Sequence, residues 1–122
     1  MKKLSILLIP IFFSVFSMAA WAAEDLEIVN GEHWKTSSLE QKRAFLYGVG
    51  NVLEIEEAMA GDNYEAMRGR SIVPVLLEGL SGTSIDDMVT QLDQYFAKHP
   101  EQSKRSVIGV LYTEMAKPNL KK

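Results

Sequence analysis

The sequence of residues 84–100 is SIDDMVTQLDQYFAKHP, and it has the features of one amphipathic helix from end to end. Thr83 or Ser84 can accept hydrogen bonds from the first backbone amides, and two aspartates follow where carboxylates stabilise a helix dipole. His99-Pro100 ends the pattern, because proline cannot continue a helix. The apolar residues have the spacing of a helix that packs on a core: Ile85, Met88, Val89, Leu92, Tyr95 and Phe96.

A longer helical pattern precedes this segment. Residues 37–41, SSLEQ, contain two overlapping capping boxes, either of which can satisfy backbone donors at a helix start. The pattern predicts a helix from there to about Ala60, closed by Gly61. Its apolar stripe comprises Leu39, Leu46, Val49, Leu53 and Ala60, widened by Phe45, Val52 and Met59.

Two shorter helices complete the pattern. One is expected from about Ser71 to Leu80, with Pro74 in its first turn, where no backbone donor is lost. The other is expected to begin after a cap at Ser103 and to end at Lys117-Pro118. Lys104 and Arg105 should point outward, and the residues that should point inward are Val107, Ile108, Leu111 and Met115. Because strand alternation is nearly absent, the sequence predicts an all-α fold, a small single-domain bundle of four to five helices.

The first 22 residues predict export. Lys2 and Lys3 precede an apolar stretch, residues 4–18, and Ala20-Trp21-Ala22 has the small-x-small pattern that signal peptidase cleaves. The alternative is an uncleaved membrane anchor over residues 4–23. Cleavage would leave one helical domain, residues 23–122, with an N-terminal arm (23–36) and a frayed tail (119–122). We therefore expect a periplasmic or secreted protein without stable membrane insertion.

Charge and the lack of cysteine narrow the function classes. Two of the 13 Lys and Arg residues lie in the leader, so 11 remain against 16 Asp and Glu residues, a net charge of -5 after cleavage. That charge disfavours nucleic acid and anionic membranes as partners and suits a cationic protein surface. The chain has no cysteine, so it has no disulfide and no thiol nucleophile.

No motif for catalysis, metal binding or cofactor binding is present. His33 and His99 are too few and too far apart for a histidine-rich metal site, and a G-x-S-x-G elbow is missing. Gly48 and Gly50 form a G-x-G without a preceding strand, which is poor evidence for a nucleotide loop. Close helix packing or a kink is the expected reason for both glycines, and a second copy could supply the packing helix as a homodimer. We predict no enzyme activity, no metal and no cofactor.

The candidate partner-binding residues are an acidic pair, two arginines and two aromatic residues: Glu54, Glu57, Arg68, Arg70, Trp34 and Tyr64. The acidic pair shares one face of the long helix, and the arginines follow in the next loop, where they could pair with that face. Aromatic residues and arginine are enriched at binding hot spots. The alternatives are a solvated acidic face and, for Trp34, a role in pinning the arm onto the long helix.

Several short motifs span most of the chain after the leader: Trp34, then Lys42, Leu46 and Gly48, then Gly82-Thr83-Ser84-Ile85, Leu92-Asp93-Gln94-Tyr95-Phe96, His99-Pro100-Glu101 and Val107. Together they resemble the Rap1a/Tai-type immunity proteins. That resemblance implies a signal peptide, a compact all-helical fold and protection of the producing cell by binding a toxic effector of a type VI secretion system. Many members of that family carry disulfides, which this chain cannot form.

The sequence thus predicts an exported helical protein that binds a protein partner, and the resemblance implies an immunity protein that neutralises a cationic toxin or effector. The alternative is an envelope stress or chaperone-like protein that binds many clients weakly. A small hydrolase that uses carboxylates is a third hypothesis.

Overall fold

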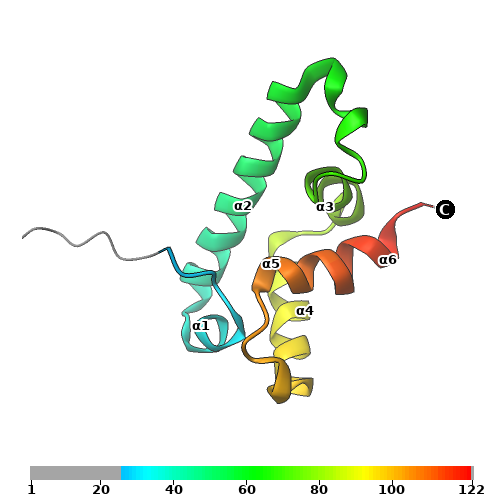
Figure 1. Cartoon of the computed structure of the whole chain (residues 1–122). Coiled ribbons are helices and arrows are strands. Elements are labelled where there is room, and N and C mark those ends of the chain that lie inside the picture. The colour runs from blue at the N-terminus through cyan, green and yellow to red at the C-terminus, as the bar shows by residue number, and fades with distance from the viewer. Residues whose placement is uncertain (1–25, 122) are drawn as a thin grey trace, which may run out of the picture.

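The structure is a computed structural model that describes residues 26–121, and it confirms the all-α fold (Figure 1). These residues contain no strand, only one β bridge between Asn30 and Ser106. The helices in chain order are α1 (Gly31–Thr36), α2 (Leu39–Ala60), α3 (Val73–Leu80), α4 (Ile85–Lys98) and a last segment in which α5 (Val107–Val110), the π-helical turn η4 (Leu111–Ala116) and α6 (Lys117–Asn119) continue without a break.

Short 3-10 turns lie in two of the connections. The turns η1 (Gly61–Asn63) and η2 (Glu65–Met67) join α2 to α3, and η3 (Pro100–Gln102) follows α4. The predicted signal peptide, residues 1–22, and the first residues of the predicted arm lie outside the described residues.

The caps of α2 and α4 confirm the sequence prediction. The Ser38 hydroxyl accepts a hydrogen bond from the Gln41 amide, and the Gln41 side chain accepts one from the Ser38 amide, so Ser38 forms the capping box of α2. Gly61 ends α2 with a positive φ of 50°, which glycine adopts without a steric penalty. The Ser84 hydroxyl caps α4 in the same way by accepting from the Asp87 amide.

The prediction of an arm up to Thr36 is wrong, because Gly31–Thr36 forms α1. The Asn30 side chain accepts hydrogen bonds from the amides of Glu32 and His33, and the His33 ring nitrogen Nδ1 accepts from the Asn30 amide. Asn30-Gly31 is therefore the start of a helix. Gly31 is needed there because a Cβ atom would overlap the ring of Phe96.

The start of the last helix also differs from the prediction. Ser106, and not Ser103, caps it by accepting a hydrogen bond from the Gly109 amide. Arg105 is not directed into solvent as predicted. Its guanidinium donates to the Tyr95 hydroxyl at 2.6 Å and to Glu114 at 2.9 Å, and so ties the connection after α4 to the last segment.

The last helix continues past Lys117-Pro118, where the sequence predicts an end. The π-helical turn before α6 widens the backbone, which relieves the clash that a proline ring makes in a regular helix. The predicted fraying of residues 119–122 is wrong at its first residue, because the Asn119 side-chain nitrogen Nδ2 donates to the Gly79 carbonyl of α3 at 3.3 Å.

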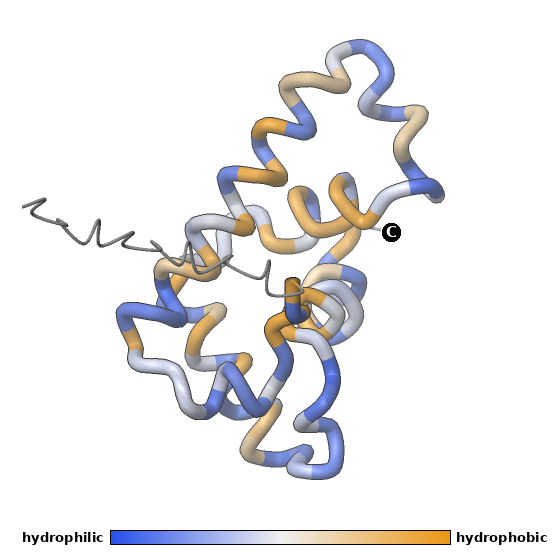
Figure 2. The backbone as a smooth tube through the Cα atoms, turned by 60° about the vertical axis from the view of Figure 1, so that its left-hand side comes forward, coloured by the Kyte–Doolittle hydropathy of each residue, from blue (hydrophilic) through white to orange (hydrophobic). Residues whose placement is uncertain are grey.

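The hydrophobic core lies where α3, α4 and the last segment pack against the N-terminal half of α2. Its most deeply buried apolar residues are Trp34, Leu76, Leu92, Phe96, Val107, Val110, Leu111 and Ala116. The helices approach closely at Gly79 and Ala116, where a Cβ on the glycine would overlap the main chain of the alanine. The backbone coloured by hydropathy shows apolar positions in this region and also along α2 beyond it (Figure 2).

The C-terminal half of α2 projects beyond this core. Leu53 is the last buried residue of the helix, and residues 54–59 are all exposed. The turns η1 and η2 lead the chain back from the end of this projection to α3 (Figure 1). Two sides of α2 are therefore accessible to solvent, and each of them borders a cavity.

Candidate functional site

A cavity of about 550 Å³ lies between α2, η2 and α3. Its floor consists of apolar side chains that also belong to the core, among them Leu46, Leu53, Leu76, Leu80 and Leu111. Four of the six predicted partner-binding residues line the same cavity: Glu54, Glu57, Tyr64 and Arg68. The structure thus brings together residues that the sequence placed on a helix and in the loop after it.

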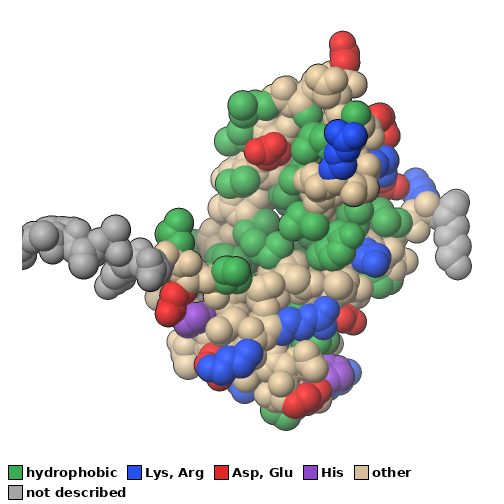
Figure 3. All heavy atoms as spheres, viewed as in Figure 1, with side chains coloured by type: hydrophobic (Ala, Val, Ile, Leu, Met, Phe, Trp, Pro, Cys, Tyr) green, Lys and Arg blue, Asp and Glu red, His purple; other side chains and the backbone are tan. Residues whose placement is uncertain are grey.

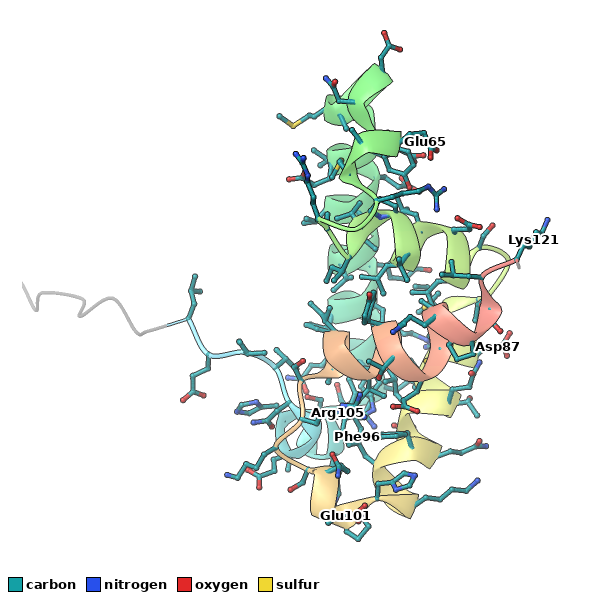
Figure 4. The ribbon with its side chains drawn as sticks, turned by 45° about the vertical axis from the view of Figure 1, so that its right-hand side comes forward. Glu65, Asp87, Phe96, Glu101, Arg105 and Lys121 are labelled. Atoms are coloured by element: carbon teal, nitrogen blue, oxygen red, sulfur yellow. The ribbon has the colours of Figure 1, made fainter. Side chains whose placement is uncertain are left out.

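Arg68 does not pair with the acidic face of α2, so that sequence-based hypothesis is wrong for this residue. Its Nε atom lies 2.7 Å from a carboxylate oxygen of Glu65, and Nη1 lies 2.8 Å from one of Glu78. These charge-assisted hydrogen bonds raise the pKa of the Arg68 guanidinium above its ordinary value. Arg68 therefore links the turn η2 to α3 at the rim of the cavity. Figure 4 shows Glu65 near the outer end of the projection.

The rim of the cavity is acidic. Three carboxylates line it, those of Glu54, Glu57 and Glu78, against the single guanidinium of Arg68. Among the described residues Glu54 and Glu57 have no ion-pair partner. Their charges are therefore not neutralised by the protein, and they face a cavity with an apolar floor.

Tyr64 adds a hydrogen-bond donor to this rim. Partial burial raises the pKa of its phenol, and the nearby Glu57 carboxylate raises it further. The hydroxyl therefore stays protonated at neutral pH and can donate a hydrogen bond to an acceptor in the cavity. The combination favours a ligand that has an apolar body, a positive charge and an acceptor such as a peptide carbonyl.

Trp34 is not available as an interface anchor, because only 1% of its surface is exposed. Its ring meets Phe45 of α2 edge-on with 6.3 Å between the ring centres, and its indole nitrogen donates to Asp93 of α4. Trp34 therefore holds α1 against α2 and α4. Arg70 is exposed but does not line the cavity.

Close helix packing or a kink was the expected reason for Gly48 and Gly50. Within the described chain, the expectation of close packing is wrong. Apart from the neighbouring residues and backbone of α2 itself, a Cβ atom on either glycine would have no atom within 4 Å. Gly50 lines the cavity described above, and Gly48 lines a second cavity beside α2. Both glycines widen a hollow instead of admitting a neighbouring helix of the same chain.

Sequence reasoning missed the wall of the cavity that α3 supplies. Leu76, Leu77 and Glu78 line it, but the sequence VPVLLEGL of residues 73–80 predicts only a buried helix. The one available signal was Glu78 itself, because a charged residue in an apolar helix marks the side of the helix that faces solvent or an ion-pair partner. Its partner in the structure is Arg68.

Comparison with known proteins found no match to this chain among the family models, the curated proteins or the solved structures. Within residues 26–121 no three His, Asp or Glu side chains are placed to hold a metal ion. The same residues include no helix that is long and apolar enough to cross a bilayer.

Proposed function

We propose that this chain is an exported protein-binding module and that the cavity between α2, η2 and α3 is its partner site. The observation that carries the proposal is the excess of carboxylates on the rim, two of them without an ion-pair partner among the described residues, around an apolar floor. Such a site is complementary to a segment that presents an apolar side chain beside a Lys or Arg.

The size of the cavity supports a peptide-like occupant. A volume of about 550 Å³ falls within the roughly 300–1,000 Å³ of small-molecule sites, which is enough for one large side chain and the backbone beside it. The acidic rim would speed encounter with a cationic protein, and the apolar floor would supply the stabilisation once the segment is bound.

The predicted export and the resemblance to Rap1a/Tai-type immunity proteins support a specific form of this function. In that form the protein resides in the periplasm and covers the active site of a toxic effector, with the acidic side of α2 against a cationic surface of the toxin. Neutralisation would be steric and electrostatic. No catalytic group of this chain is needed for it.

The test is capture of partners by the tagged full chain from a cell-envelope extract of its source, read by mass spectrometry. The double variant Glu54→Lys/Glu57→Lys should lose the dedicated partner, because it replaces two rim carboxylates by cations. The variant Glu56→Lys is the matched control, since this residue is exposed on the same helix but does not line the cavity.

Two results would count against the proposal. Retention of the partner by Glu54→Lys/Glu57→Lys would exclude the cavity as the binding site. Capture of many weak clients would favour the chaperone-like alternative over a dedicated partner if the purified chain also stopped a model protein from aggregating on heating.

A further inference from the structure

The opposite side of α2 carries a second unpartnered surface. Ala44, Gly48, Val52, Ile55 and Met59 share one face of the helix, which we call the outer face of α2. All five are exposed, with 60% of Val52, 58% of Ile55 and 80% of Met59 open to solvent. Hydrophobic side chains are visible along α2 in the space-filling view (Figure 3).

A groove borders the N-terminal half of the outer face. It has a volume of about 570 Å³ and is lined without a single charged residue by parts of α2, α3 and α5, including Phe45, Ile72 and Ile108. Gly48 opens it, since a Cβ atom there would have no other atom of the described chain within 4 Å. Glycine weakens a helix relative to alanine, so Gly48 lowers the stability of α2. The space that it leaves open in the groove is not filled by any described residue.

The two halves of the outer face differ in size. Ala44 and Gly48, in the N-terminal half, are small and lie beside the groove. Ile55 and Met59, in the C-terminal half, are large and protrude into solvent. One surface therefore carries both a hollow and the side chains that could fill it.

We propose that a second copy of this chain covers the outer face, with the two α2 helices antiparallel. If Ala44 lies opposite Met59 of the second copy, Gly48 lies opposite Ile55, because the members of each pair are equally far from a two-fold axis between residues 51 and 52. Each protruding half then fills the hollow of the other copy. The same contacts form twice, as an interface between identical subunits requires.

Charge favours this face for self-association. Each copy is acidic, so two copies repel unless their contact surface lacks carboxylates. The outer face has no charged residue, and neither does the groove lining. Two acidic chains can therefore meet there without bringing like charges into contact.

The exposed apolar area is large enough to mark an interaction surface. The open parts of Val52, Ile55, Met59 and Ile72 amount to on the order of 450 Å², within the range of the largest patch on a monomer, which is often functional. A standard interface buries about 800 Å² on each partner, so this patch supplies about half of one and fits a reversible dimer.

The proposed dimer leaves the acidic cavity open. Glu54 and Glu57 lie away from the outer face of α2, since they are roughly 120–180° around the helix from Gly48 and Met59. A dimer would therefore present two acidic cavities, and loss of dimerisation and loss of partner binding can be measured independently.

Sedimentation velocity of the purified protein over a series of concentrations tests the proposal. We expect a reversible dimer whose dissociation constant rises by more than about tenfold in Ile55→Glu, which would bury two carboxylates in an apolar contact. Gly48→Leu should have the same effect, because it fills the groove. Ala97→Glu, at an exposed position of α4, adds the same charge elsewhere and should leave the dissociation constant unchanged.

Cysteine crosslinking tests the register, because the described chain has no cysteine of its own. A mixture of the single variants Gly48→Cys and Ile55→Cys should form a disulfide-linked dimer on mild oxidation, while each variant alone should not. The two positions lie about 10 Å apart along one helix, too far for a bond within a chain.

Three outcomes would overturn the proposal. The first is a monomer at every concentration, which would leave the outer face to a different protein. The second is a dimer with the same dissociation constant in Ile55→Glu as in the wild type. The third is crosslinking of a single variant with itself and no mixed disulfide in the mixture, which would require another arrangement of the two helices.

Discussion

The indole nitrogen of Trp34 donates a 2.8 Å hydrogen bond to the Asp93 carboxylate. The same carboxylate oxygen lies 2.9 Å from the ammonium of Lys42, which also lies 5.4 Å from the centre of the Trp34 ring. One acidic side chain of α4 thus receives a donor from α1 and another from α2. These contacts hold the N-terminal helix on the core.

Removal of the Asp93 carboxylate should therefore destabilise the whole domain. Asp93→Ala leaves the buried indole donor unpaired, which costs about 1–3 kcal/mol of unfolding free energy. Asp93→Asn keeps an acceptor and should cost less. Urea denaturation followed by tryptophan fluorescence measures both. Equal stability of Asp93→Ala and the wild type would show that the indole finds another partner.

Gly50 and Gly79 should respond to alanine in opposite directions. Nothing lies near the Cβ position of Gly50, so Gly50→Ala should raise the unfolding free energy by about 0.5–1 kcal/mol through its helix propensity. Gly79→Ala should lower it by about 1–3 kcal/mol, because the methyl group would overlap the main chain of Ala116. Thermal denaturation of the two variants checks the signs, and stabilisation by Gly79→Ala would show that α3 can move away from the last segment.

The helix caps explain how much of this fold could be predicted. The bounds of α2 and α4 depend on hydrogen bonds between residues three apart, such as Ser38 with Gln41, and such pairs are visible in the sequence. The start of α1 also has a local cap, in which Asn30 pairs with His33, but its attachment to the rest of the fold depends on distant partners, since the amides of Gly31 and Glu32 donate to the carbonyls of Arg105 and Ser103. No local pattern reports contacts of that kind.

The same distinction applies to the candidate site. Helical periodicity was enough to place Glu54 and Glu57 on one side of α2. The closing wall comes from α3, where Glu78 engages Arg68, and only the three-dimensional structure brings that helix to the cavity. Trp34 was open to two interpretations, because its burial depends on the packing of α1 against α2 and α4.

Stability should fall at acid pH through carboxylates that are ion-paired in the folded state. The hydrogen bond from Arg105, followed by that from Thr113, holds the pKa of Glu114 below its ordinary value of 4.5. Lys104 and Arg43 lower the pKa of Glu32 and Asp86 in the same way.

The sign follows from proton uptake. Because the folded-state pKa values are lowered, the unfolded chain binds these protons first, so the stabilisation is complete above about pH 4.5 and is lost as the pH falls through the folded values. Glu114→Gln should reduce the slope of unfolding free energy against pH in this range. Parallel curves for the variant and the wild type would show that Glu114 does not contribute.

The proposed export predicts a defined new N-terminus. After expression of the full chain in a bacterium, N-terminal sequencing of the purified protein should begin at Ala23. The variant Ala20→Leu/Ala22→Leu removes both small residues of the cleavage pattern and should stay uncleaved in the membrane fraction. A wild-type chain that keeps Met1 would support the anchor instead.

Arg68 should control the connection between α2 and α3 more than it controls global stability. It bonds to Glu65 and Glu78, and 46% of its side chain is exposed, so its loss should change the unfolding free energy only slightly, as for other ion pairs at the surface. Arg68→Gln should nevertheless speed amide hydrogen exchange over residues 61–71, because it detaches η2 from α3. Arg70→Gln is the matched control, since Arg70 is exposed in the same connection and forms no ion pair among the described residues. Equal exchange in both variants would mean that the connection is held by its backbone turns alone, and the rim of the cavity would then keep its shape without the arginine.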